Sequence, residues 1–338
     1  MDLNTLWFIL LTILFSGFFF LEGFDYGVGI LLPFVAKTDQ ERRAVINTIG
    51  PVWDGNEVWM IVAGGAMFAA FPHMYATLFS GFYVALMFML IGLIIRGVSF
   101  EFRSKRESPR WRSTWDWAVF FGSLLPALLW GVAVANLMRG VAIEADMNYY
   151  GGLLPLLNPF SLFGGLVFLG LFTIHGASFL SIKLEGEVHQ RVKALSGKLW
   201  IAAVVLAVVF LIWTYLATDI LNNPGWDGLI PAILAALALL AYGLFLRLDR
   251  EGLAFLSGGL AIVLATVMVF SGLFPRLMIS TLDPANSLTI YNAASGPYTL
   301  KVITIVTAIF LPFVLAYQGW TYWIFRKRIS AETPDLHY

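Results

Sequence analysis

Nine long apolar runs recur from near the start of this chain almost to its end. A helix needs about 20 apolar residues to cross roughly 30 Å of hydrocarbon. A transmembrane barrel would instead show segments of about 10 residues in which apolar and polar residues alternate. The runs therefore predict an all-α, polytopic membrane protein with spans at Leu6–Pro33, Val52–Phe71, Tyr75–Gly97, Trp117–Leu137, Phe160–Ile182, Leu199–Leu221, Leu229–Leu248, Ala254–Phe274 and Leu300–Phe325.

The low charge content supports a membrane location. The 338 residues are 59% apolar and 12% charged, which is too little charge to cover a water-facing surface. No stretch between the runs could form a soluble domain, and no Walker motif is present, so kinase, ATPase and protease functions are excluded. We expect one integral membrane domain over 1–338, with two four-helix bundles (about 5–138 and about 160–275) and one extra helix (about 300–325).

The basic residues predict the orientation in the membrane. All but three of the 21 Lys and Arg residues lie at or after the end of the first, third, fifth, seventh or ninth span, the exceptions being Arg139, Arg276 and Lys301. Because positive charge collects on the cytoplasmic side, we expect the N-terminus outside and the C-terminus in the cytoplasm. No basic residue precedes the first run and no cleavage site follows it, so we expect no signal peptide and a chain beginning at Met1.

The histidine and cysteine content limits the possible cofactors. The chain has no Cys, which excludes disulfides, iron–sulfur clusters and thiolate chemistry. Haem needs placed axial ligands, and only His175 lies within a predicted span, since His73, His189 and His337 lie in a turn, a loop and the tail. We expect no haem or metal in this chain, and a buried His175 hydrogen-bonded across helices. The net charge of zero gives no support for binding nucleic acid.

Four carboxylates and one arginine interrupt the first three runs: Glu22, Asp25, Asp54, Glu57 and Arg96. A carboxylate within a span costs roughly 2.5–3.5 kcal/mol, so each needs a partner, water or a function. With the N-terminus outside, all five lie in the cytoplasmic half of the bilayer, and the two acidic pairs have i, i+3 spacing. The pattern predicts charge or proton handling inside the membrane, with Arg96 influencing the charge of neighbouring carboxylates.

Structural interpretations of the same carboxylates remain open. Asp54 and Glu57 follow Pro51 and are suited to be an N-cap and a first-turn acid that the helix dipole favours. Asp25 is equally suited to an interfacial ion pair with a nearby arginine, the candidates being Arg42, Arg43 and Arg96.

Two further charged features are given structural interpretations. Asp116, three residues after Ser113 and just before an apolar run, resembles a capping box. The charged run from Glu101 to Arg112 is expected to be a solvated loop, with contact to anionic lipid as the alternative.

Six short motifs follow one another in the first half of the chain. They are Gly23-Phe24-Asp25-Tyr26-Gly27-Val28-Gly29, Trp53-Asp54-Gly55-Asn56-Glu57-Val58-Trp59, Ser80-Gly81-Phe82-Tyr83-Val84-Ala85, Phe102-Arg103-Ser104-Lys105, Trp115-Asp116-Trp117 and Leu156-Leu157-Asn158-Pro159-Phe160. In this order they resemble subunit II of the cytochrome bd-type quinol oxidases. The resemblance extends from about residue 5 to the end, is strongest in the first 160 residues, and includes the length and the nine-helix count.

The resemblance implies a heterodimeric terminal oxidase of the respiratory chain in the bacterial cytoplasmic membrane, which oxidises quinol and reduces O₂ to water. In that family subunit I carries the quinol-binding loop and all the haems, two of type b and one of type d. Subunit II is haem-free and supports assembly and haem retention. The choice of ubiquinol or menaquinol, a small single-helix third subunit, and a bound lipid or quinone stay open.

The resemblance also implies roles for the polar residues of the first three spans. Asp25, Asp54 and Arg96 match positions assigned to a proton path from the cytoplasm. The family position of Glu57 is not acidic in every member, and Glu22 is a secondary candidate. We therefore expect Asp54 and Asp25 to relay protons while Arg96 sets their charge state, with no catalytic, cofactor-binding or metal-binding residue in this chain.

Two other classes of function fit the residues without the resemblance. Intramembrane carboxylates, Gly-interrupted helices and two similar halves also describe secondary transporters. A purely structural scaffold for a partner subunit is the other alternative.

Overall fold

The computed structural model describes residues 2–223, 225–332 and 336. Met1 and His337, which the sequence analysis named, lie outside these residues. The described chain is almost entirely helical, and its one small sheet is an antiparallel pair of strands, β1 (Arg276–Met278) and β2 (Leu288–Thr289). The helices are α1 (Leu3–Val35), α2 (Asp39–Ile49), α3 (Trp53–Ala70), α4 (Pro72–Gly81), α5 (Tyr83–Phe102), α6 (Pro109–Arg139), α7 (Pro159–Lys183), α8 (Gly186–Ala217), α9 (Leu229–Arg247), α10 (Glu251–Leu273) and α11 (Pro297–Ile324).

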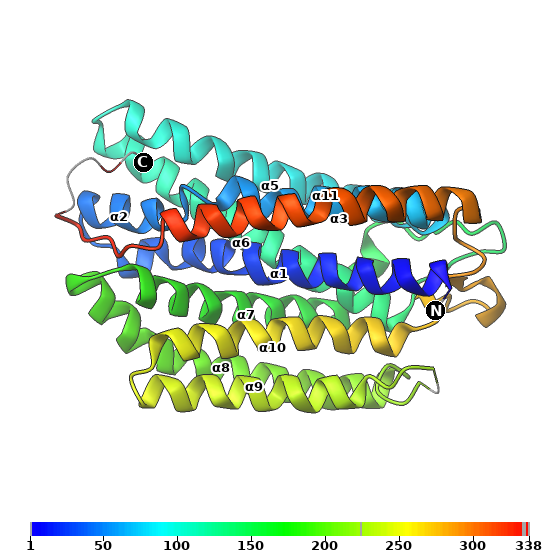
Figure 1. The fold of residues 1–338 in the computed structure, drawn as a ribbon. Helices are drawn as coiled ribbons and strands as arrows, with labels where there is room; N and C mark the ends of the chain where they lie inside the picture. The colour runs from blue at the N-terminus through cyan, green and yellow to red at the C-terminus, as the bar shows by residue number, and fades with distance from the viewer. Residues whose placement is uncertain (1, 224, 333–335, 337–338) are drawn as a thin grey trace.

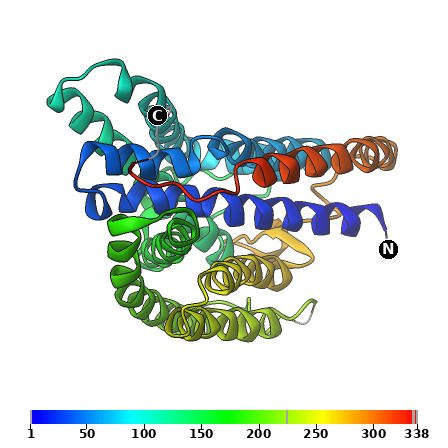
Figure 2. The same cartoon turned by 60° about the vertical axis from the view of Figure 1, so that its left-hand side comes forward.

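The long helices run side by side, with α1 near the centre of the molecule (Figure 1). Helix α1 packs against α3 and α6 on one side and against α7 and α10 on the other. Helices α8 and α9 form an outer layer beyond α7 and α10 (Figure 2). Helix α11 contacts α3 and α1 and begins at the same end of the bundle as α1.

Among the described residues, eight helices are long and apolar enough to cross a membrane, namely α1 and α5 to α11. The second predicted span corresponds to α3, which is not among them. Its first two turns hold Asp54, Asn56 and Glu57, which lower its hydropathy. The all-helical membrane fold is thus confirmed, whereas the count of nine spans and the orientation stay predictions.

The third predicted span is broken, and α8 begins within a predicted loop. The span over Tyr75–Gly97 is divided at Phe82 into α4 and α5, next to Gly81, where a Cβ would lie 2.6 Å from the Tyr149 ring. Helix α8 begins at Gly186, well before the predicted Leu199. Apolar periodicity missed these turns because they carry charged residues beyond the hydrocarbon-length run.

Helix α2 was not predicted, although its start has a recognisable signal. The Thr38 hydroxyl accepts the Glu41 N–H at 3.2 Å, and the Glu41 carboxylate accepts the Thr38 N–H at 3.1 Å, which together form a capping box. Burial alone would raise the pKa of Glu41, but hydrogen bonds from Arg191 and from the N–H groups of Lys37 and Thr38 hold it below its usual value. The charged Glu41 therefore joins α2 to α8.

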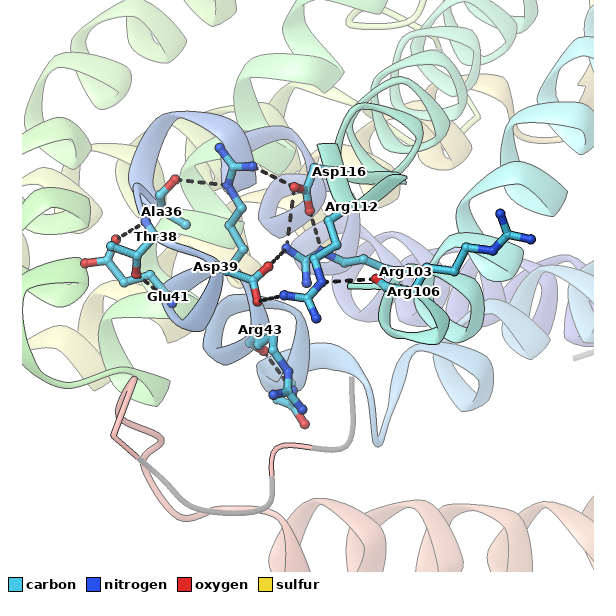
Figure 3. A network of polar contacts seen from close by, with 11 residues as sticks. Ala36, Thr38, Asp39, Glu41, Arg43, Arg103, Arg106, Arg112 and Asp116 are labelled. Atoms are coloured by element: carbon cyan, nitrogen blue, oxygen red, sulfur yellow. Dashed lines mark hydrogen bonds and ion pairs between the residues drawn. The ribbon is translucent and has the colours of Figure 1, made fainter. Parts of the chain in front are cut away.

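A network of ion pairs holds α2 against the junction of α5 and α6 (Figure 3). Asp116 accepts hydrogen bonds from Arg103 Nε at 2.6 Å and from Arg42 Nη1 at 2.7 Å. Asp39 pairs with Arg103 and Arg112, each at 2.8 Å. We call the end of the bundle that holds this network the basic end.

This network corrects two predictions. Asp116 is not part of a capping box, because α6 begins at Pro109 and Asp116 lies inside it at 2% exposure. The run from Glu101 to Arg112 is not solvated throughout, because Arg103 is 1% exposed. Both side chains point inward because each neutralises the other in a place with little water.

Helices α1 and α7 cross with their backbones in contact. A Cβ on Gly27 would lie 2.0 Å from the Phe172 carbonyl oxygen, and a Cβ on Gly176 would lie 2.4 Å from the Gly27 carbonyl carbon. Small residues at such crossings allow the close approach that stabilises helix pairs in membranes. The crossing fixes the depth of α1, and therefore of Glu22 and Asp25.

We expect Gly27→Ala to destabilise the fold by about 1–3 kcal/mol, because the new methyl group meets backbone atoms that cannot move aside. The midpoint of thermal unfolding in detergent measures the effect. Gly197→Ala in α8 is the matched control, since its Cβ has no neighbour within 4 Å. Equal midpoints for the two variants would contradict the close crossing.

Candidate functional site

The structure brings Glu22 and Asp25 of α1, Glu57 of α3 and Arg96 of α5 together inside the bundle. Glu22, Asp25 and Arg96 have 0% exposure, and the Glu57 side chain is 16% exposed. We call these four residues the Arg96 cluster. The sequence analysis placed these four residues and Asp54 at one depth in three spans, and the structure brings all of them together except Asp54.

The guanidinium of Arg96 is the centre of the cluster. Its Nη2 forms an ion pair with Glu22 and a longer one with Glu57 Oε2 at 3.5 Å. Its Cζ lies 4.7 Å from the centre of the Tyr26 ring, at cation–π distance. Gly122 of α6 leaves room for Arg96, because a Cβ there would lie 2.8 Å from the Arg96 Cβ.

Asp25 is buried and has an amide as its partner. Asn56 Nδ2 donates to Asp25 Oδ2 at 2.7 Å, and the structure gives Asp25 no ion pair with a described arginine. The interpretation of Asp25 as an interfacial residue paired with Arg42, Arg43 or Arg96 is therefore wrong. A carboxylate with no exposed surface cannot reach the interface.

Asp54 lies apart from the cluster. It is exposed in the first turn of α3 and, among the described residues, has no side-chain hydrogen bond or ion pair. Its interpretation as an N-cap is wrong, since the N-cap is Val52 and makes no side-chain bond. Asp54 is instead the acidic residue of the first turn, the place that the sequence analysis gave to Glu57. Asp54 precedes Glu57 by three residues, so both lie on one side of α3.

The cluster has more carboxylates than cations. Three carboxyl groups surround one guanidinium, so the net charge of the cluster depends on how many protons it holds. Glu22 Oε2, Asp25 Oδ1, and Arg96 Nε and Nη1 are buried without a partner in the described part of the chain. Buried polar atoms are nearly always hydrogen-bonded, so water or a second chain is expected to complete the site.

Three polar residues near Asp25 were not predicted, namely Asn56, Gln318 and Tyr322. Asn56 Oδ1 accepts from Tyr322 Oη at 2.7 Å and from Gln318 Nε2 at 3.3 Å. The available signal was the i, i+4 spacing of Gln318 and Tyr322 within an apolar run. These two side chains are neutral, so an analysis based on charged residues does not identify them.

His175 is buried between α1, α7 and α10. Its Nε2 lies 3.0 Å from the Phe20 carbonyl oxygen, and its ring stacks on Phe255 with centroids 4.7 Å apart. The predicted histidine hydrogen-bonded across helices is confirmed. Within the described residues, no group of three or more His, Cys, Asp and Glu side chains is placed to hold a metal ion.

An apolar cavity of about 660 Å³ lies between α1, α3, α4, α5 and α6. Its walls include Phe15, Met67, Tyr75, Met89 and Trp130. The cavity is large enough for a substantial part of a hydrophobic molecule.

We expect Arg96→Met to destabilise the fold by about 3–5 kcal/mol, because it leaves Glu22 buried without its cation. The double variant Glu22→Leu with Arg96→Met should recover most of that stability, since an apolar pair of similar size needs no compensation. Thermal unfolding in detergent compares the two. A double variant no more stable than the single one would show that the pair is not the dominant interaction of Arg96.

Three comparisons identify the relatives of the chain. Residues 3–325 match the family model described as cytochrome bd terminal oxidase subunit II. The chain is 42% identical over 333 residues to cytochrome bd ubiquinol oxidase subunit 2 of Bacillus subtilis (strain 168), covering 98% of each chain. It is 38% identical over 367 residues to cytochrome bd-I ubiquinol oxidase subunit 2 of Escherichia coli (strain K12), covering 98% of this chain and 96% of that one.

The structural comparison agrees at the level of the fold. A solved structure of bd oxidase from Geobacillus thermodenitrificans superposes with a TM-score of 0.76 and 18% identity, covering 96% of this chain and 99% of that one. Together with the helices long enough to cross a membrane, these matches indicate a multi-pass bacterial membrane protein. The chain belongs to the cytochrome bd terminal oxidase subunit II family.

Proposed function

We propose that this chain is the haem-free subunit of a terminal oxidase that oxidises quinol and reduces O₂ to water. It supports the assembly of subunit I and the retention of its haems, and contributes a proton inlet. The relatives named as ubiquinol oxidase subunits support the reaction. The observation that carries the inlet is the Arg96 cluster, in which buried carboxylates outnumber the cation.

The histidine environment supports placing the haems, two of type b and one of type d, on subunit I. Two described histidines lie in membrane-crossing helices. His189, predicted in a loop, is in the first turn of α8 and pairs with Glu251 at 2.5 Å, and His175 Nε2 already faces a backbone carbonyl at 3.0 Å. Phe20, Phe24 and Phe255 surround its ring, and a Cβ on Gly259 would lie 3.0 Å from its Cε1. These residues do not fit a haem, so no step of the reaction is assigned to a haem in this chain.

Protons enter at the exposed Asp54 and pass toward the cluster through water. Glu57, three residues further along α3, reaches Arg96, and Asp25 follows Glu22 by three residues on α1. Each carboxyl group takes up a proton from the cytoplasmic side and releases it toward the next group in the path. The fixed positive charge of Arg96 favours the ionised form of the neighbouring carboxylates and so influences how many protons the site holds. No hydrogen bond joins Asp54 to Asp25 among the described residues, so water is needed for the transfer.

Subunit I packs on the face formed by α3 and α11. Helix α11 is the least buried of the spans, with 6% of its most apolar window inside the chain. Asp54 is exposed on this face, whereas the exposed residues at the middle of α8 and α9 are apolar, such as Val205, Val209 and Leu237. Because a carboxylate facing hydrocarbon is costly, Asp54 favours contact with protein. The other exposed residues of α3 and α11 are mostly apolar, such as Ile61, Ile309 and Phe313, and suit packing against the helices of a partner.

The remaining parts of the proposal concern topology and small partners. The whole chain is one integral membrane domain with nine spans, two four-helix bundles and an added helix. Its N-terminus lies outside and its basic end in the cytoplasm. A membrane lipid or quinone occupies the apolar cavity between α1 and α6, and a small single-helix subunit is an optional third chain.

We expect Asp25→Asn and Asp54→Asn to slow quinol-driven O₂ consumption about tenfold or more, because an amide cannot take up a proton. The haem content of the purified complex should stay unchanged. Glu144→Gln at the other end of the molecule is the control, since Glu144 is exposed and its side chain has no partner in the described structure. Unchanged turnover in a variant removes that residue from the inlet, and loss of haem would favour a purely structural role.

We expect the haem b and haem d absorption bands only in samples that contain a partner chain, after purification from the native membrane in mild detergent. His175→Phe should leave the bands of the complex unchanged, because His175 is held by Phe20. Bands on the isolated chain would overturn the haem-free assignment. Absence of haem from both samples would favour a secondary transporter.

A further inference from the structure

A chain of hydrogen bonds runs from the C-terminal part of α11 to the carboxyl group of Asp25. Gln318 Oε1 accepts from Trp59 Nε1 at 2.8 Å, and Gln318 Nε2 donates to Asn56 Oδ1 at 3.3 Å. Asn56 Nδ2 then donates to Asp25 Oδ2 at 2.7 Å. Two amides from different helices thus link an indole to one carboxyl oxygen.

The indole of Trp59 determines the direction of every bond in this chain. An indole nitrogen donates and never accepts, so it requires the oxygen end of the Gln318 amide. That turns Gln318 Nε2 toward Asn56, which must present Oδ1. Asn56 Nδ2 therefore faces Asp25, and Asp25 Oδ2 is an acceptor.

Tyr322 secures the orientation of Asn56 a second time. Its hydroxyl donates to Asn56 Oδ1 at 2.7 Å, a shorter bond than the one from Gln318. Asn56 is completely buried, so water cannot replace these donors. Rotating the amide by half a turn would lose both bonds and place Oδ1 against the Asp25 carboxyl group.

The two oxygens of Asp25 therefore differ. Oδ2 is held by the Asn56 amide, whereas Oδ1 is buried and has no donor in the part of the chain that the structure describes, and the Glu22 carboxyl group lies beside Asp25. We propose that Asn56 and Tyr322 are positioning residues, which keep Oδ2 of Asp25 as an acceptor and reserve Oδ1 as the oxygen that takes up and releases the proton. The inference rests on the proposed proton inlet.

The proton step involves one bond at one atom. A proton from the water chain forms an O–H bond at Oδ1 and converts the carboxylate to a neutral acid, and its departure to the next water restores the carboxylate. The Asn56 N–H···Oδ2 bond persists in both states, because Oδ2 accepts in each. Asp25 thus exchanges its proton without rearrangement of the side chain or its neighbours.

The surroundings of Asp25 define what else acts on its charge. The titratable and charged groups that face it are Glu22 on its own helix, Glu57 on α3, Arg96 on α5 and Tyr322 on α11. Of these, Tyr322 alone comes from the helix that has little contact with the rest of the chain. The position of α11 therefore influences the hydrogen bonding of the Asp25 carboxyl group through Asn56.

The test uses the complete oxidase with Tyr322→Phe, which removes one hydroxyl and keeps the ring. Its matched control is Tyr317→Phe on the same helix, where the tyrosine is 67% exposed. Two readouts report on Asp25: the pH profile of turnover, and the infrared carboxyl band that Asp25→Asn abolishes. Haem content, measured in parallel, reports assembly.

We expect Tyr322→Phe to shift that infrared band and to lower turnover about threefold to tenfold near neutral pH. On the acidic limb of the pH profile, where Asp25 must release its proton, the pH of half-maximal turnover should rise by about half a unit to one unit, because the charged carboxylate loses part of its donor. Asn56→Leu, which removes the donor entirely, should give a larger change of the same sign. Tyr317→Phe should resemble the unmodified complex.

The outcomes separate this inference from the proton inlet itself. If Asp25→Asn slows turnover while Tyr322→Phe leaves the band and the pH profile unchanged, the positioning role is wrong and the inlet stands. If Asp25→Asn turns over normally, the inlet through Asp25 is wrong. Equal changes in Tyr322→Phe and Tyr317→Phe would also overturn the positioning role, since they would reflect a general effect on α11.

Discussion

A guanidinium with no exposed surface, enclosed where three membrane helices meet, is the constraint on which the rest of this structure depends. The positive charge of Arg96 is balanced by Glu22 from α1 and Glu57 from α3. Helix α5 can therefore pack in its observed position only when α1 and α3 lie at the matching depth. The close contact of α1 with α7 sets that depth. Packing of small residues thus determines where charge lies, and the charge in turn determines which helices must be neighbours.

Polar groups are distributed along the bundle in two levels with different properties. At the basic end, Asp116 and Asp39 are shared among three arginines, and each of these carboxylates accepts from two guanidinium groups. Deeper in the bundle, carboxylates outnumber the cation and several polar atoms have no described partner. The first level suits a rigid joint, because its charges are paired. The deeper level suits exchange of protons, because one of its carboxylates can gain or lose a proton while the ion pairs at the basic end stay intact.

The sequence predicted the membrane class and the helical fold, because hydrophobic length is a property of the chain alone. Of the five residues that it placed at one depth, Glu22, Asp25, Glu57 and Arg96 meet, whereas Asp54 stays exposed outside the cluster. The sequence did not predict the burial of Arg103 and Asp116, since both lie beyond the apolar runs, where charged residues are ordinarily solvated. The sequence alone was equally consistent with Asp25 at the membrane interface or inside the bundle, because the difference depends on its partner Asn56, which comes from another helix. Gln318 and Tyr322 were missed for the same reason: neutral polar residues acquire a role through a neighbour 262 or more residues away.

The backbone contact between Gly27 and Gly176 also has a mechanical meaning. Two helices whose main chains touch form a stiff unit, since no side chains between them can yield. The peripheral helices α8, α9 and α11 are the least buried of the spans, so we expect them to be the more compliant parts of the molecule. When the surrounding bilayer thickens or thins, the tilt that accommodates the mismatch is taken up by these outer helices, and the carboxylates on α1 keep their level in the membrane.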